Sequence, residues 1–276
     1  MILSKMRNIT LFSLVLLLAA TAQAQEKQHY MYGTIGGGSN SISYNLKNGN
    51  TKGGFGCSLN LGYILFFNET WGLSTGIGIQ WYQATGTINY LDSSPSTDTD
   101  GDNYDFRTYY NNWKEKQKIV LLDVPVGALY HKQFKKIYGL LACLGFKMSV
   151  PVKPAYEAAG GDITTTGYYQ QWNVELEDMP QHNFTTITSV PGSDFSAKMV
   201  FSLYADLGGT YKINKNLDLY AGPYFNYGLN NLINKSTKKV YQQDGIYNGI
   251  LSSSQTQKAH VLSVGFKIGA ILHLEK

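Results

Sequence analysis

The sequence predicts an all-β protein: an eight-stranded, antiparallel, up-and-down transmembrane β-barrel with short periplasmic turns and long extracellular loops. Three observations lead to this class. Eight segments alternate between apolar and polar residues with a period of two, the period of a β-strand. The connections between these segments alternate in length, and the chain begins with the pattern of an export signal.

The composition excludes several other classes of protein. Of 276 residues, 43% are hydrophobic, 13% are aromatic and only 15% are charged, whereas disordered chains are rich in charge and poor in aromatic residues. Two cysteines cannot form a disulfide-dense scaffold. The formal net charge is +4 and no cluster of Lys and Arg suggests a nucleic-acid groove, so we expect no nucleic-acid partner.

The first 24 residues have the pattern of a signal peptide. Lys5 and Arg7 form a basic region, an apolar run covers residues 9–20, and Ala22-Gln23-Ala24 supplies the small residues that signal peptidase requires. The apolar run is too short to span a bilayer of roughly 30 Å as a permanent helix. We therefore expect cleavage after Ala24 and a mature outer-membrane barrel domain over residues 25–276.

Eight alternating segments cover most of the mature chain. We expect strands at about 29–44, 53–67, 71–90, 117–131, 137–152, 197–212, 217–230 and 257–274. In 53–67 the odd-numbered residues are apolar and the even-numbered residues up to Gly62 are Gly, Ser or Asn. The same division recurs in 71–90, where Trp, Leu and Ile alternate with Gly, Ser and Gln up to Trp81. It recurs again in 217–230 and 257–274.

Apart from a short turn at 48–50 in the first hairpin, the connections between these segments are short at one end of the barrel and long at the other. Residues 68–70, 132–136 and 213–216 are tight turns, whereas 91–116, 153–196 and 231–256 are long and polar. A soluble sandwich has no reason to keep its tight turns at one end. An outer-membrane barrel has short periplasmic turns and long extracellular loops, and its even number of strands returns both termini to the periplasm.

The glycine-rich face of the strands is predicted to line the interior of the barrel. Eight strands leave room only for side chains inside, which suits small residues. The charged residues of the segments fall on this same face and are expected to form a charge network in the lumen: Asp123, Lys147, Asp206, Asp218 and Lys267. Opposite charges can pair in the lumen, whereas a Lys on the lipid face costs about 2–4 kcal/mol at the midplane. The alternative role for these charged residues is a proton or ion relay through the lumen. The alternative to the membrane barrel is a soluble lipocalin-like barrel.

Aromatic residues on the apolar face lie beside the short turns. We expect them to form the membrane girdle at the periplasmic interface, where amphipathic rings are favoured: Phe67, Trp71, Tyr130, Tyr138 and Tyr211. The outer girdle would consist of Phe55, Trp81 and Tyr227.

Two motifs resemble a known family. Residues Leu122-Asp123-Val124-Pro125-Val126 resemble the hydrophobic–acidic–hydrophobic–Pro–hydrophobic signature of PorT-like outer-membrane β-barrel proteins, and Trp71-Gly72-Leu73-Ser74-Thr75-Gly76 is similar to another of their recurring pieces. The resemblance implies a small barrel of OmpA/OmpX type in a Gram-negative cell envelope, with no catalytic residues to carry over. Asp123 stands where Glu is more usual, and the chain ends on Lys276 where outer-membrane proteins commonly have an aromatic residue. We read Pro125 as a local β-bulge.

The long connections contain candidate binding residues. Large rings among Asn, Gln and Thr either bind protein or glycan surfaces or pack the connections into an ordered cap: Tyr104, Phe106, Tyr109, Tyr110, Trp113, Tyr168, Tyr169 and Trp172. The acidic run from Asp98 to Asp102 is either a calcium site or a solvated loop tip, and its glycine is misplaced for an EF-hand.

The sequence favours a non-enzymatic outer-membrane barrel with a filled lumen, whose extracellular connections bind a protein or glycan ligand. A narrow channel or a transport or secretion accessory component is the second hypothesis. An outer-membrane enzyme is the third, since one connection carries several acid and base side chains: Asp162, Glu175, Glu177, Asp178, His182 and Asp194. We expect the protein to contact outer-membrane lipid. We expect no cofactor and no metal site.

Overall fold

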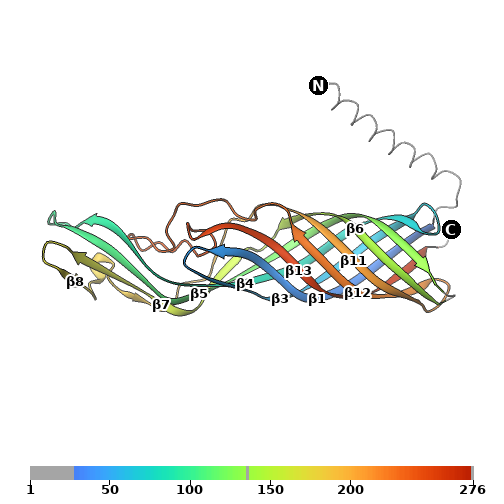
Figure 1. Cartoon of the computed structure of the whole chain (residues 1–276), viewed down its shortest axis with the longest axis horizontal. Coiled ribbons are helices and arrows are strands. Elements are labelled where there is room, and N and C mark those ends of the chain that lie inside the picture. Colours follow the sequence, from blue (N-terminus) through green and yellow to red (C-terminus); the bar gives the residue numbers. More distant parts are fainter. Residues whose placement is uncertain (1–27, 135–136, 275–276) are drawn as a thin grey trace, which may run out of the picture.

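The computed structural model describes residues 28–134 and 137–274, whose regular structure is almost entirely antiparallel β-strand (Figure 1). The predicted signal peptide and its cleavage site lie outside the described residues. Eight long strands form a barrel: β1 (Gln28–Leu46), β3 (Phe55–Phe66), β4 (Trp71–Thr97), β5 (Asn103–Gln133), β6 (Tyr138–Pro151), β11 (Val200–Lys212), β12 (Leu217–Gly228) and β13 (Thr256–Leu274).

The eight strands close on themselves. They pair in the order β5-β6-β11-β12-β13-β1-β3-β4, and β4 pairs with β5 to complete the ring. Each strand pairs with its neighbour in the chain, and β1 pairs with β13, so the topology is up-and-down. The predicted fold class, an eight-stranded antiparallel transmembrane barrel, is confirmed. We call the end with the short turns the turn end and the opposite end the loop end.

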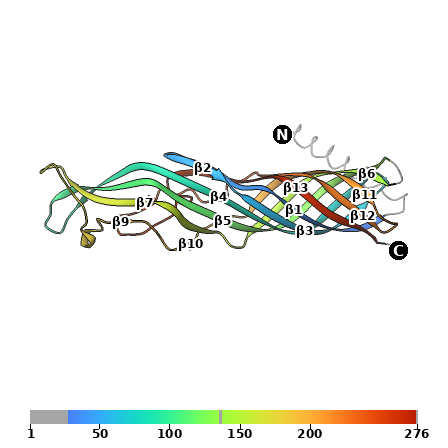
Figure 2. The ribbon, with the colours of Figure 1, turned by 90° about the horizontal axis from the view of Figure 1, so that it is seen from below.

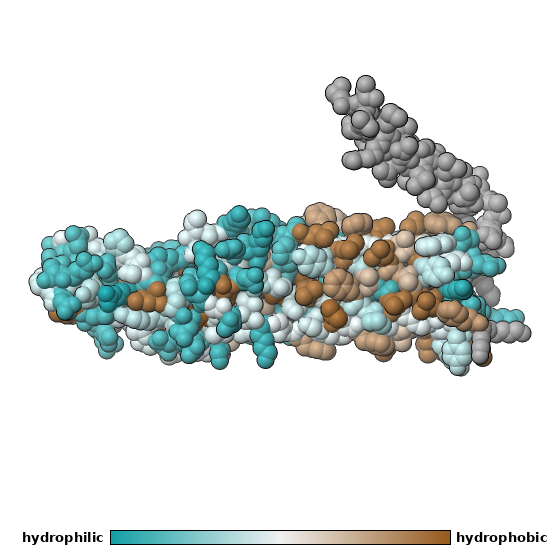
Figure 3. All heavy atoms as spheres, viewed as in Figure 1, coloured by the Kyte–Doolittle hydropathy of each residue, from teal (hydrophilic) through white to brown (hydrophobic). Residues whose placement is uncertain are grey.

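The outside of the barrel is an apolar band. Large apolar side chains on every strand point outward and are exposed, among them Ile35, Leu61, Ile77, Val126, Phe146, Leu207, Phe225 and Phe266. On β4 the band runs from Trp71 to Trp81, about 25 Å along the barrel axis at ~3.3 Å per residue and a tilt of roughly 40°. The brown surface of Figure 3 marks this band between hydrophilic ends. It has the height of a membrane's hydrocarbon core.

The described part of the chain holds no helix with the length and apolar character needed to cross a membrane.

The inside of the barrel is crowded. A Cβ atom on Gly36 would lie 2.8 Å from Lys267 Cγ and 3.2 Å from a ring carbon of Tyr224, so only glycine fits between these side chains. The β-bulge expected at Pro125 is absent, because the β4–β5 register is the same at Thr75–Val126 and at Gly78–Asp123. Pro125 instead stays in line with β6, opposite Lys147.

The sheet continues well beyond the apolar band at the loop end. The prediction that 91–116 and 153–196 are loops is wrong for much of both segments. β4 and β5 extend to a turn at 98–102, and β7 (Ala155–Tyr169) adds a third strand. Short strands complete this extension: β2 (Gly49–Gly53), β8 (Val174–Leu176), β9 (Thr186–Ile187) and β10 (Ser193–Asp194) (Figure 2). A 3-10 turn, η2 (Pro180–His182), lies between β8 and β9.

The extension has a core of its own. Its inner face is covered by the connections 170–199 and 229–255, which fold back onto β4, β5 and β7. The core is formed by fully buried side chains from these segments, including Ile88, Trp113, Ile119, Ile163, Leu232, Val240, Ile250 and Leu251. We call residues 229–255 the cap, because they close the loop end of the barrel.

Candidate functional site

The interior of the barrel contains two ion pairs. Lys147 Nζ lies 3.2 Å from Asp123 Oδ2, and these side chains are 6% and 1% exposed. Lys147 Nζ also donates to Gln80 Oε1 at 3.3 Å. Lys267 Nζ donates to Asp206 Oδ1 at 2.7 Å. Four of the five predicted network residues are therefore brought together as pairs inside the lumen.

The fifth residue, Asp218, lies away from these pairs at the turn end. Its Oδ2 is 2.9 Å from His273 Nε2, a partner that sequence reasoning did not assign. The signal was available, since His273 has the inward parity of Ile271 on β13. Asp218 and His273 line an open mouth of ≈ 740 Å³, together with His29 and His131.

Little space remains between the two ion pairs. A cavity of ≈ 60 Å³ is lined by Lys147, Asp206 and Lys267 among other residues. Above it, Tyr82 accepts a hydrogen bond from Asn226, and the cap core follows. The lumen therefore narrows from an open mouth at the turn end to packed side chains.

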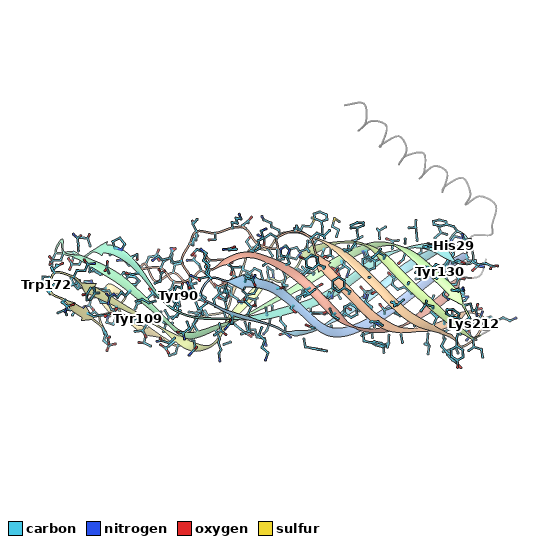
Figure 4. The ribbon with its side chains drawn as sticks, viewed as in Figure 1. His29, Tyr90, Tyr109, Tyr130, Trp172 and Lys212 are labelled. Atoms are coloured by element: carbon cyan, nitrogen blue, oxygen red, sulfur yellow. The ribbon has the colours of Figure 1, made fainter. Side chains whose placement is uncertain are left out.

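The aromatic residues predicted as the girdle all lie at the turn end. Trp71 and Tyr130 pack edge to face across β4 and β5 with ring centroids 5.1 Å apart, and Tyr138 packs against Tyr211 at 5.5 Å. Trp71, Tyr138 and Tyr211 are exposed, whereas Phe67 and Tyr130 are half-buried. Figure 4 shows Tyr130 at this end, far from Trp172.

The extension divides the eight predicted loop aromatics into two groups. Five are buried inside it: Tyr104, Phe106, Tyr110, Trp113 and Tyr169. Tyr109 and Tyr168 are half-buried, and Trp172 is 58% exposed at the tip (Figure 4). Tyr104, Tyr169 and Trp172 stack in sequence, with ring centroids 5.2 Å and 5.4 Å apart. The exposed indole therefore rests on a fixed aromatic column.

A charged cluster fixes the outer side of the tip. Glu175 accepts hydrogen bonds from Arg107, Tyr109 and Thr166, and the Arg107 guanidinium lies 3.7 Å from the centre of the Tyr168 ring. Burial works to raise the pKa of Glu175, but these hydrogen bonds and the Arg107 charge together outweigh it and lower the pKa.

The acidic run at the tip closes a turn. Asp98 Oδ1 accepts the backbone N–H groups of Asp100 and Asp102, and Asp98 Oδ2 accepts the Tyr169 hydroxyl. Asp102 in turn accepts from the Gln171 side chain. These hydrogen bonds occupy carboxylate oxygens that a calcium ion would need. Within residues 28–134 and 137–274, no group of three or more His, Cys, Asp or Glu could hold a metal ion.

The acid and base side chains considered for catalysis have separate partners. His182 stacks on Phe184, Asp162 accepts from Asn111, and Glu175 belongs to the Arg107 cluster. Among the described residues, these contacts do not link a nucleophile, a base and an acid to one another.

A buried carboxylate that sequence reasoning missed joins the cap to β5. Glu115 is 0% exposed and accepts hydrogen bonds from Gln117 Nε2 at 2.7 Å, Tyr247 Oη at 2.6 Å and the Ile250 backbone N–H at 2.9 Å. Burial raises the pKa of Glu115, because desolvation outweighs the hydrogen bonds to its charged form. The signal was its inward parity between Trp113 and Gln117.

The chain matches no protein-family model and no curated protein. Similar solved structures include Neisserial surface protein A, with 11% identity, 91% of this chain and 100% of that chain covered, and a TM-score of 0.38. The outer membrane protein OprG from Pseudomonas aeruginosa has 8% identity, coverage of 92% and 99%, and a TM-score of 0.41. The attachment invasion locus protein Ail of Yersinia pestis has 12% identity, coverage of 90% and 99%, and a TM-score of 0.31. At these values the likeness says nothing about function.

Proposed function

We propose that this protein is an integral outer-membrane barrel that carries no current and presents a rigid extracellular extension for binding glycans. The observation that carries the proposal is the continuation of β4, β5 and β7 beyond the apolar band as a packed sheet with Trp172 exposed at its tip. The turn end then faces the periplasm and the loop end faces outward. The PorT-like resemblance of Leu122–Val126 agrees with this placement.

The chemistry of the tip favours a sugar ligand. The Trp172 ring rests on Tyr169 and is exposed to solvent, so a flat apolar surface is available at little entropic cost. The exposed side chains of Gln170, Gln171 and Asn173 lie next to it in the chain, and each is held by one hydrogen bond, to Asp105, Asp102 and Tyr168 respectively. A ring face bordered by hydrogen-bonding amides suits the apolar face and the hydroxyl groups of a pyranose.

Replacing Trp172 with alanine tests the binding function. We expect purified wild-type protein in detergent to be retained on a glycan array, and the variant to bind at least tenfold more weakly, since a stacked aromatic anchor is worth about 2 kcal/mol or more. The control is Ile246→Ala, which removes an exposed apolar side chain from the cap. If the wild type binds no glycan on the array, or if W172A binds as well as the wild type, a glycan ligand at this tip is refuted.

The packed interior gives a second expected result. Refolded protein in a planar bilayer should show no steady conductance, because the ion pairs and the cap core fill the path beyond the turn-end mouth. A steady single-channel current from the wild type would support the channel hypothesis instead. A variant that lacks residues 234–246 of the cap is the comparison for ionic current that leaks through the loop end.

A further inference from the structure

A stripe of lysines lies on the outer face of the barrel just past the apolar band at the loop end. On β5 the outward-facing residues Val124, Leu122 and Val120 are followed, with unchanged parity, by Lys118, Lys116 and Lys114. Lys52 on β2 shares a pairing row with Lys116 through Thr85 of β4. These four lysines therefore occupy one face of the sheet β2–β4–β5.

The stripe carries an excess of positive charge. Lys118 pairs with Glu157 at 2.6 Å, and both side chains are about half exposed. Asp194 shares the pairing row of Lys118 through Ala155. Glu157 also lies directly opposite Lys116 in the β5–β7 pairing, and among the described residues of these rows no further carboxylate lies opposite Lys52 or Lys114. Four lysines therefore face two carboxylates on this surface. Like charges two residues apart on a strand repel each other, so the stripe gains from a bound anion.

The height of the stripe matches the headgroup layer of a membrane. Val120 pairs with Trp81, the upper limit of the apolar band. Lys118 and Lys116 lie two and four residues from Val120 toward the loop end, about 5 and 10 Å higher along the barrel axis. The headgroup layer is roughly 5–8 Å thick on each side, so the backbone of Lys118 lies within it. Lys116 lies just above this layer and Lys114 is higher still, and their long side chains can reach down to it.

Exposed lysines also follow the band elsewhere around the rim. Lys153 comes directly after the exposed Val152, and Lys198 comes just before Met199 and Phe201. Thr85, between Lys52 and Lys116, and Thr87, opposite Lys114, add hydroxyl donors to the main stripe. Ammonium and hydroxyl donors in one plane suit phosphate groups.

We propose that the stripe formed by Lys52, Lys114, Lys116 and Lys118 binds the phosphate groups of lipids in the outer leaflet. The proposal rests on the membrane orientation given above for its cellular setting. A lipid is the source of the phosphate because the stripe continues the lipid-facing rows of the same strand. A lipid whose acyl chains lie on Val120 and Leu122 carries its phosphate at the level of the lysine ammonium groups.

Native mass spectrometry of the detergent-solubilised full chain tests this proposal with lipid A, a bisphosphorylated glycolipid. We expect the triple variant K114Q/K116Q/K118Q to bind lipid A about tenfold or more weakly than the wild type, since each lysine near a lipid surface contributes a severalfold effect. The matched control, K215Q/K235Q/K238Q, removes three exposed lysines elsewhere and should bind like the wild type. Dephosphorylated lipid A should bind weakly to all three proteins.

Three results would overturn the proposal: equal binding by the triple variant, an equal loss in the control, or binding that does not depend on the lipid phosphates. Heat-modifiable migration on a gel shows that each variant is folded before it is measured. The assay is independent of Trp172 and of glycan binding, so a failure of the proposed function and a failure of this inference are distinguishable.

Discussion

Replacing Lys147 with methionine is expected to lower the free energy of unfolding by about 3–5 kcal/mol. The substitution leaves Asp123, which is 1% exposed, charged and without its ion-pair partner inside the barrel. Removing both charges, in D123N/K147M, should recover most of this loss, because the desolvated charge is then absent as well. Urea-induced unfolding in phospholipid vesicles, followed by tryptophan fluorescence, measures all three proteins.

Lys118→Met is the control for the loss of a lysine from an ion pair. Lys118 and Glu157 are about half exposed, so breaking that pair should cost about 0–1 kcal/mol. A K147M variant as stable as this control, or a double variant less stable than K147M, would show that the interior pair is not electrostatically coupled.

Replacing Glu115 with alanine is expected to release the cap while leaving the barrel folded. The change removes the acceptor of the Tyr247 hydroxyl and of the Ile250 backbone N–H, and each buried donor left unpaired costs about 1–3 kcal/mol. Trypsin should then cut after the exposed Lys238 at least tenfold faster than in the wild type. Glu177→Ala, which removes an exposed carboxylate from the extension, is the control.

The cap should also respond to pH through Glu115. Because burial raises its pKa above the ordinary value of 4.5, the folded state holds the proton more tightly than the unfolded state. The stability from this group is complete below about pH 4.5 and is lost as the pH rises through the folded pKa. Cap protection against a pH-tolerant protease should therefore decline with rising pH, and E115Q should flatten this decline. The pKa of Glu175 is lowered in the folded state, so the stability from this group is present above its ordinary pKa of 4.5 and is lost as the pH falls through the folded pKa.

The sequence by itself determined the barrel. A period of two fixes which side chains share a face, and the placement of Gly, Asp and Lys on one parity fixes that this face is the interior. Asp123 and Lys147 could be assigned to the lumen for this reason, and Trp71 and Tyr211 to the band edge. These properties are local, because they depend on neighbours along one strand.

Only the tertiary structure decided what lies beyond the membrane band. The segment from Tyr104 to Trp113 looked like a polar loop, because four of its ten residues are charged or amide-bearing. Its buried residues are covered from elsewhere in the chain: Tyr110 and Trp113 pack in one core with the cap, more than 100 residues away, and Tyr104 and Phe106 pack against Tyr169 and Phe184. Whether such a segment is a strand depends on what covers its inner face, and that contact is not written in the segment itself.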